Sequence, residues 1–223
     1  MAIILNLETA TKNCSVGIAN DGKSIALIEE ASDKYIHSEK LHQFIQDALA
    51  EADVQFADLD AIAVSNGPGS YTGLRIGVSA AKGLCYALDI PLIAHNTNDV
   101  LLQTIEAQDS DADYMTVIDA RRNEVFARLY NAVKDPITPI EAVELAGGMY
   151  ANSARLCVVG DAAQKTADLL EHDHVQVVQQ YPSARQMVAI SESSFRSGSF
   201  ADLAYHEPYY LKDFVAGKPR KLL

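Results

Sequence analysis

The chain has 223 residues, and 18 Lys and Arg residues against 30 Asp and Glu residues give it a formal net charge of −12. Hydrophobic residues make up 48% and charged residues 22%, which is the composition of a globular protein and not of a disordered segment. Because contacts between phosphates and Lys or Arg supply much of the affinity of nucleic-acid binders, this charge argues against a chain that binds RNA or an anionic membrane by itself.

Cysteine usage and the N-terminus favour a cytoplasmic protein. Cys14, Cys85 and Cys157 are widely spaced and form no Cys-x-x-Cys pair, as expected of reduced thiols. The apolar N-terminus has no basic region and soon reaches Asn6 and Glu8, so we expect a strand there and not a signal peptide. We find no apolar run of the length that spans a bilayer.

The first half of the chain is predicted to form three strands, a helix, a strand, a second helix and a further strand, at residues 2–8, 14–19, 24–28, 36–52, 59–65, 73–88 and 91–94. The turn signal Asn20-Asp21-Gly22 separates the second and third strands. The first helix follows from apolar residues that recur at helical spacing, Leu41, Phe44, Ile45, Ala48, Leu49 and Ala52.

The second half repeats this alternation of strands and helices. Strands are predicted at 114–119, 124–130, 156–160 and 175–178, and helices after Asp161 to about 171 and at 184–196. Asp161 is expected to cap the first of these helices, and residues 131–153 are the most loop-like. Placing the boundary near Asn96–Asn98 gives an α/β protein with two related subdomains, at residues 1–97 and 98–223, with the last segment returning to the first subdomain.

The helix at 73–88 is unusually apolar, with Arg75 and Lys82 as its only charged residues. One stripe consists of Leu74, Val78, Ala81, Cys85 and Leu88, and several further apolar or small residues fall largely outside it, namely Ile76, Ala80, Gly83 and Ala87. A helix that is apolar nearly all round is buried on more than one side. Either its own fold encloses it, or it packs one face on the sheet and another on a partner subunit.

A glycine-rich segment, Gly67-Pro68-Gly69-Ser70-Tyr71-Thr72-Gly73, precedes this helix. Backbone N–H groups between a strand and a helix often bind phosphate. Yet Thr72 stands where a dinucleotide loop needs its third glycine, and Leu74 stands where a P-loop needs lysine. The segment is therefore interpreted as a rigid turn that directs the start of the helix.

Residues for catalysis or metal binding do not form a recognisable set. His37 and His42 are five residues apart, which turns them away from each other on a helix, and His172-Asp173-His174 is expected to end a helix at the surface. Ser70 has no identifiable His/Asp relay. Asp119 and Arg121 are interpreted first as an ion pair or a turn cap.

Four segments in order resemble the TsaB (YeaZ) family. The most specific is 65–77, Ser-Asn-Gly-Pro-Gly-Ser-Tyr-Thr-Gly-Leu-Arg-Ile-Gly. The others are Leu5-Asn6-Leu7-Glu8-Thr9-Ala10 at the start, 118–126 midway, and Pro208-Tyr209-Tyr210-Leu211-Lys212 near the end.

The resemblance implies an actin/hexokinase-like fold of two ribonuclease-H-like subdomains and a role in making N6-threonylcarbamoyladenosine in tRNA. TsaB proteins are non-catalytic partners that activate the paralogue TsaD, which transfers threonylcarbamoyl to the tRNA adenosine beside the anticodon. TsaE, an ATPase, joins the complex. We therefore expect no tightly bound cofactor or metal on this chain, ATP or ADP and metal on the partner subunits, tRNA contact only through the complex, and a homodimer when the chain is alone.

The resemblance also implies site residues. The two helices, 36–52 and 73–88, would pair with their TsaD counterparts through Leu41, Ile45, Tyr71, Leu74, Arg75, Gly77, Val78, Ala81, Lys82 and Cys85. The motif loop would consist of Gly67, Pro68, Gly69, Ser70, Thr72 and Gly73. A degenerate nucleotide cleft would consist of Glu8, Thr9, Asp119 and Arg121.

Two features qualify this expectation. Glu8 stands where the family commonly has Asp, which argues against nucleotide binding. The end of the chain is basic, with Lys212, Lys218, Arg220 and Lys221 against Asp213, and is the segment expected to approach tRNA. The alternative function is an independent small-molecule kinase or a glycoprotease-like metalloenzyme of the same fold.

Overall fold

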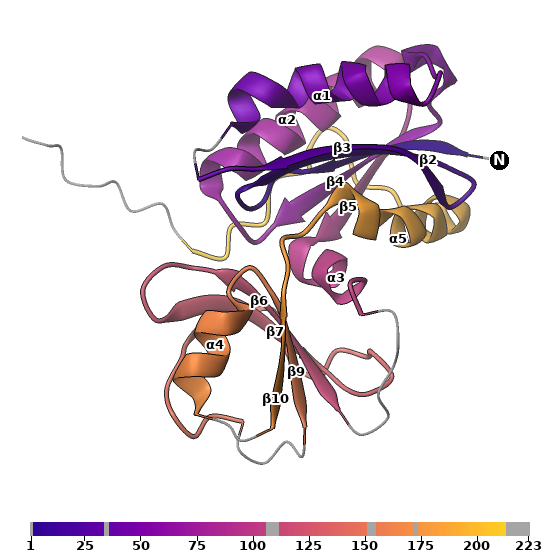
Figure 1. Cartoon of the computed structure of the whole chain (residues 1–223). Helices are drawn as coiled ribbons and strands as arrows, with labels where there is room; N and C mark the ends of the chain where they lie inside the picture. The colour runs from indigo at the N-terminus through magenta and orange to yellow at the C-terminus, as the bar shows by residue number, and fades with distance from the viewer. Residues whose placement is uncertain (1, 34–35, 106–111, 151–154, 172–173, 213–223) are drawn as a thin grey trace, which may run out of the picture.

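A computed structural model of the chain describes residues 2–33, 36–105, 112–150, 155–171 and 174–212. These residues form two lobes, each built on a five-stranded mixed sheet (Figure 1). None of the helices in this part of the chain combines the length and apolar character needed to cross a membrane. All three cysteines are buried free thiols.

The first sheet has the strand order β3-β2-β1-β4-β5. Its strands are β1 (Ile3–Glu8), β2 (Asn13–Asn20), β3 (Lys23–Ala31), β4 (Ala61–Gly67) and β5 (Leu92–Asn96). β2 pairs antiparallel with β1 and β3, whereas β4 pairs parallel with β1 and β5. Because β1 and β4 are covered on both faces, they are nearly continuous apolar runs.

The second sheet repeats that arrangement with the order β10-β9-β6-β7-β8. Its strands are β6 (Asp113–Asp119), β7 (Glu124–Tyr130), β8 (Glu141–Glu144), β9 (Leu156–Gly160) and β10 (Val175–Gln179). Counted from its own first strand, each sheet has the order 3-2-1-4-5 and the same strand directions. The predicted repetition of one α/β unit is therefore confirmed. The prediction of a loop throughout 131–153 missed β8, a short edge strand with glutamates at both ends.

Helices cover both faces of the first sheet (Figure 1). α1 (His37–Glu51) and α2 (Tyr71–Leu88) lie on one face, and α5 (Ala184–Ser197) lies on the other. Hydrogen bonds tie α5 to this sheet, with Ser191 Oγ 2.7 Å from Asn6 Oδ1. A helix from the second half of the chain thus completes the first lobe.

The chain first passes from the first lobe to the second through the short helix α3 (Thr97–Leu102). Asn98 is fully buried, and its Nδ2 donates to Thr116 Oγ1 of β6 at 2.9 Å. Asp99 Oδ1 accepts hydrogen bonds from Arg128 Nη1 at 2.9 Å and from the Tyr130 hydroxyl at 2.8 Å. The predicted boundary near Asn96–Asn98 thus falls on an anchored helix, and the division at residue 97 stays a prediction about domains.

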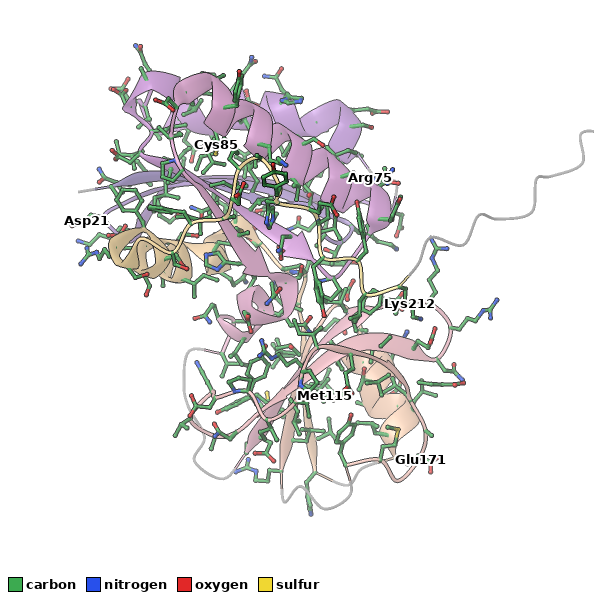
Figure 2. The ribbon with its side chains drawn as sticks, turned by 180° about the vertical axis from the view of Figure 1, so that it is seen from behind. Asp21, Arg75, Cys85, Met115, Glu171 and Lys212 are labelled. Carbon is green, nitrogen blue, oxygen red and sulfur yellow. The ribbon has the colours of Figure 1, made fainter. Side chains whose placement is uncertain are left out.

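The segment Ala201–Lys212, here called the strap, returns from α5 across the first lobe toward the second (Figure 2). Ala201 forms a bridge with Leu92 of β5. Lys82 of α2 donates from its Nζ to the backbone oxygens of Ala204, at 3.2 Å, and His206, at 2.8 Å. At the far end, Lys212 pairs with Glu124 of β7. The strap therefore contacts α2 and both lobes.

Asp161 does not cap α4 (Ala163–Leu170), contrary to the prediction. The residue before the helix is Ala162, which has no capping side chain, and the Gln164 amide of the first turn donates to Gln179 Oε1 of β10 at 2.9 Å. The Asp161 carboxylate accepts a hydrogen bond from the Asp119 amide at the end of β6, at 2.9 Å.

Candidate functional site

The start of α2 packs tightly into the turn that follows β1. Ser70 donates from its backbone N to the Ala10 oxygen at 2.6 Å, and Thr9 Oγ1 donates to the Gly73 oxygen at 2.9 Å. A Cβ added at Gly73 would lie 2.2 Å from the Thr9 backbone oxygen, and one at Gly69 would lie 2.3 Å from the Ala10 oxygen. The glycines of the motif are therefore required for this close approach.

This packing changes the assignment of the motif loop. α2 begins at Tyr71, so Thr72 and Gly73 belong to its first turn and not to a loop. Ser70 is the N-cap residue, and its side chain accepts a hydrogen bond from the Gly73 amide at 3.3 Å. The Ser70 hydroxyl therefore has a structural role at the helix start.

The residues predicted to form a degenerate nucleotide cleft do not form one surface. Glu8 and Thr9 are fully buried, so neither can contact a nucleotide, whereas Asp119 and Arg121 are exposed on the second lobe. The start of α2 packs against Thr9. The structure therefore does not bring these four residues together as one exposed cleft, and the absence of a tightly bound nucleotide stays a prediction.

Glu8 has an unusual electrostatic environment. Its Oε1 accepts a hydrogen bond from the Ala10 amide at 2.6 Å. Burial raises the pKa of the Glu8 carboxyl to about 7, opposed by hydrogen bonds from Ala10 and Ser65. Asp161 of the second lobe adds to this rise in the Glu8 pKa, and burial raises the pKa of Asp161 itself to about 6. Two carboxyl groups therefore oppose each other across the junction of the lobes.

Most of the predicted partner-contact residues point into the core of this chain. The seven buried ones are Leu41, Ile45, Leu74, Gly77, Val78, Ala81 and Cys85. Five of them belong to the apolar core of the first lobe, whereas Leu74 lies against Gly67 and Gly77 lies against Thr9. Because all seven are buried, they cannot contact a partner while the lobe stays folded. The remaining three, Tyr71, Arg75 and Lys82, face the strap: the Arg75 Nε donates to the Tyr210 hydroxyl at 3.1 Å, and the rings of Tyr71 and Tyr210 are 4.7 Å apart.

The surface that remains open lies on the opposite side of α2. It is a shallow, mainly apolar groove of about 490 Å³ between α1 and α2, here called the α1–α2 groove. Its lining consists of Ser38, His42, Ile76, Ser79, Ala80, Gly83 and Leu84. Beside it, the Tyr86 side chain is 81% exposed. The signal for this face was the set of small and apolar residues outside the main stripe of the helix.

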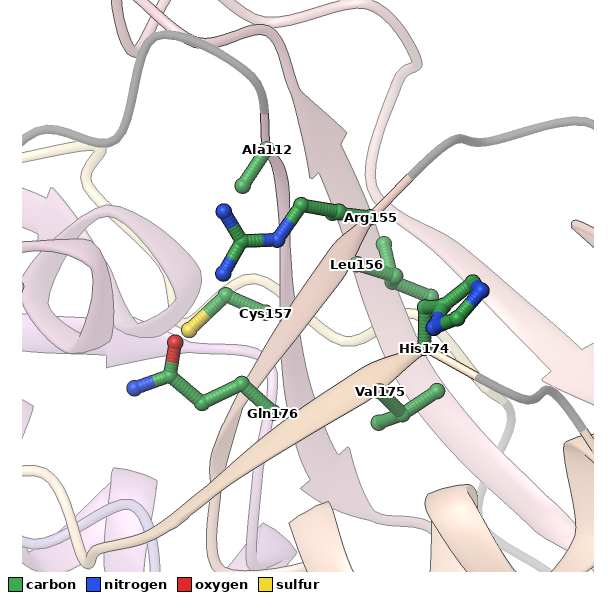
Figure 3. A pocket seen from close by; sticks show the side chains of 7 residues that line it. All are labelled: Ala112, Arg155, Leu156, Cys157, His174, Val175 and Gln176. Atoms are coloured by element: carbon green, nitrogen blue, oxygen red, sulfur yellow. The ribbon is translucent and has the colours of Figure 1, made fainter.

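A second pocket, of about 210 Å³, lies at the edge of the second sheet (Figure 3). Its walls come from the ends of three strands, at Ala112, Arg155, Leu156, Cys157, His174, Val175 and Gln176. Of these, Cys157 was expected to be a reduced thiol and His174 to lie at the end of a helix, and His172 and Asp173 lie outside the described residues. The described residues contain no group of three His, Cys, Asp or Glu side chains placed to hold a metal ion.

His37 and His42 are separated as their spacing predicts. His37 is buried, its Nε2 lies 3.3 Å from the Asn13 oxygen, and burial lowers the pKa of its imidazole. His42 is exposed and lines the α1–α2 groove. The two rings therefore belong to different environments.

Two sheets of identical order and strand direction, joined with a shared helical junction, define an actin/hexokinase-like protein built from two ribonuclease-H-like lobes. A solved structure titled "YeaZ from Pseudomonas aeruginosa" has the same fold, with a TM-score of 0.82 at 24% identity over 95% of this chain and 100% of that one.

Sequence comparisons give the family. The family model described as "TsaD: tRNA N6-adenosine threonylcarbamoyltransferase" matches residues 29–217. The protein named "tRNA threonylcarbamoyladenosine biosynthesis protein TsaB" of Escherichia coli (strain K12) is 30% identical to this chain, in an alignment that covers 96% of each protein. Its namesake in Bacillus subtilis (strain 168) is 35% identical over 63% of this chain and 62% of its own length. The chain belongs to the TsaB (YeaZ) family.

Proposed function

We propose that this chain is a non-catalytic subunit in the biosynthesis of tRNA threonylcarbamoyladenosine, and that it binds and activates a TsaD-family protein through the α1–α2 groove. The names of its TsaB relatives support the pathway. The observation that carries the contact is the groove itself, an apolar surface on a helix whose other faces are covered by the chain's own core and strap.

The chemistry of the groove suits a helix of another protein. Ser79, Ala80 and Gly83 are small, and a Cβ at Gly83 would meet no atom within 4 Å. Small residues allow a second helix to approach closely, while Ile76 and Leu84 offer apolar area to bury. Tyr86 at the margin is the type of exposed aromatic residue that anchors interfaces.

Catalysis is assigned to the partner because the described side chains of this chain have other roles. Ser70 caps α2, and Lys165 bonds to the carboxylate of Asp119 at 2.6 Å. We propose that ATP or ADP and the metal bind to the partner subunits. TsaE belongs to the same complex, and tRNA binds through the complex. The alternative, an independent kinase or metalloenzyme, is not favoured by any described arrangement of residues.

In the absence of its partner, the chain is expected to form a homodimer through the same groove. An exposed apolar surface that lacks its partner tends to pair with a second copy. Light scattering with increasing amounts of the TsaD-family protein then measures the conversion of this homodimer into the heterodimer.

Ser79→Arg and Gly83→Arg test the contact, because each places a long cation in the groove without touching the core. We expect each variant to keep the unfolding temperature of the parent chain and to lose co-elution with the TsaD-family protein of the same organism in gel filtration. Ser193→Arg is the matched control, since it makes the same change at an exposed position of α5 on the other face of the sheet.

Co-elution of both groove variants at parent levels would refute the proposed interface. Loss of binding in the Ser193→Arg control as well would show that added charge, and not the groove, governs assembly. Submicromolar binding of ATP or zinc to the isolated chain, measured by calorimetry, would support the independent enzyme instead.

A further inference from the structure

The turn between β6 and β7 holds two arginines in a backbone conformation that L-residues disfavour. Arg121 and Arg122 are consecutive, with φ angles of 71° and 50°, and both are exposed. Residues 121–123 form a three-residue loop closed by the hydrogen bonds between Ala120 and Glu124 and between Glu124 and Arg121, and its two left-handed positions favour Gly or Asn because a Cβ crowds the backbone there. Neither guanidinium group forms a hydrogen bond or an ion pair with another described residue.

The rest of the turn is held rigidly. Lys165 Nζ lies 2.6 Å from Asp119 Oδ1, 3.0 Å from the Arg122 oxygen and 2.8 Å from the Glu124 oxygen. Asp119 Oδ1 also accepts a hydrogen bond from the Arg121 amide at 3.0 Å. Lys165 and Asp119 thus maintain the turn through backbone and carboxylate atoms, and the arginine side chains are free to point outward. Residues that hold a disfavoured backbone conformation, and whose side chains form no hydrogen bond or ion pair within the chain, are typical of functional sites.

Further cations lie along the same edge of the molecule. Lys212 of the strap pairs with Glu124, which follows the turn, and its Nζ lies 5.8 Å from the centre of the Phe126 ring. Arg75 and Lys212 lie on the same side (Figure 2). Arg75 is exposed, and no carboxylate of the described residues lies within ion-pair distance of it.

Charge and aromatic rings together identify the ligand class. Four cations at this edge, Arg121, Arg122, Lys165 and Lys212, outnumber three carboxylates, Asp119, Glu124 and Glu144, the last of which lies opposite Glu124 on β8. This edge is therefore locally positive although the whole chain carries −12. The Arg75 guanidinium lies 4.1 Å from the centre of the Tyr71 ring, next to the half-exposed ring of Tyr210. Such arginine and tyrosine planes also stack on unpaired bases, which an acidic peptide lacks.

We propose that Arg121 and Arg122 bind the phosphate backbone of an RNA that lies along the edge formed by this turn, Lys212 and Arg75. The proposal rests on the proposed function, in which the complex binds tRNA. It reconciles a strongly acidic chain with an RNA substrate, because the contact is local and supplements those of the partner.

The double variant Arg121→Asn/Arg122→Gly separates binding from structure, because Asn and Gly tolerate the positive φ angles of these positions better than Arg does. In the complex with the TsaD-family protein, we expect its affinity for fluorescently labelled, unmodified tRNA to fall about tenfold in anisotropy titrations, with a smaller salt dependence. The isolated variant chain is expected to unfold at a higher temperature than its parent. Lys23→Gln/Arg185→Gln is the matched control, removing two exposed cations elsewhere, and should leave both properties unchanged.

Parent affinity and salt dependence in the turn variant would overturn the proposal, as would an equal loss in the control. A lower unfolding temperature of the turn variant would refute the strain argument. Gel filtration of every variant with the partner separates these outcomes from failure of the proposed function. If no complex forms, the proposed function fails, and equal tRNA affinity of the isolated parent and turn-variant chains at low salt would overturn this proposal as well.

Discussion

Glu8 shows how one residue at the end of β1 relates the two lobes. The sequence drew attention to it because it stands in place of an aspartate, a substitution that argues against nucleotide binding at the turn and leaves that absence a prediction. Its complete burial and its interaction with Asp161 were not predictable, because they depend on how the second lobe sits against the first. A residue considered as a ligand is thus part of the junction between lobes.

Glu8→Gln tests this environment through pH. The pKa of Glu8 is about 7 in the folded chain and near 4.5 when exposed, so folding takes up a proton between these values. The Glu8 contribution therefore favours folding at low pH and is lost as the pH rises toward 7. In urea unfolding, the free energy of unfolding of Glu8→Gln minus that of the parent chain is expected to be more positive at pH 8 than at pH 5. Equal pH dependence of the unfolding free energy in the two proteins would contradict the assigned environment of Glu8.

At the scale of elements, α2 has three different surfaces. One packs in the core, one bonds to the strap through Lys82, and one forms the α1–α2 groove. Periodicity predicted the helix and its inward stripe, including Val78 and Ala81. Assigning that stripe to a partner was wrong, because an apolar stripe of a single helix does not indicate whether its own sheet or another chain covers it.

The glycines of α2 provide a test within one helix. A Cβ at Gly73 would lie 2.2 Å from the Thr9 backbone oxygen, whereas one at Gly83 meets no atom within 4 Å. Gly73→Ala is therefore expected to destabilise the chain by about 1–3 kcal/mol, since the turn after β1 must move. Gly83→Ala is expected to be neutral or to stabilise it by up to about 1 kcal/mol through helix propensity.

Chemical denaturation monitored by circular dichroism measures both changes. Equal stabilisation by the two substitutions would show that both glycines act through helix propensity alone. That result would remove the packing explanation of the motif.

Other elements show where sequence patterns lose their information. α1 was predicted at 36–52 and is found at His37–Glu51, because its apolar spacing continues over several turns. β3 extends to Ala31, beyond the predicted 24–28, because its pairing with β2 continues past the apolar run. The packing of α5 on the first sheet and the path of the strap depend on contacts between distant residues, which local periodicity does not encode.

For the whole molecule, the duplicated sheet order and the acidic charge lead to the same interpretation. Both sheets have the strand order expected of an actin/hexokinase-like protein, and in the first lobe the start of α2 packs closely against the turn after β1. The same helix offers its remaining face outward. We therefore propose that the chain acts by assembly with a partner.

Reconstitution of tRNA modification tests this central claim most directly. The TsaD-family protein, TsaE, unmodified tRNA and threonylcarbamoyl-adenylate are combined with the parent chain, with Ser79→Arg/Gly83→Arg, or with Ser193→Arg, and the modified nucleoside is measured by mass spectrometry. We expect full product with the parent and with Ser193→Arg, and loss of most product with the groove variant or without the chain. Undiminished product without the chain, or with the groove variant, would contradict the account.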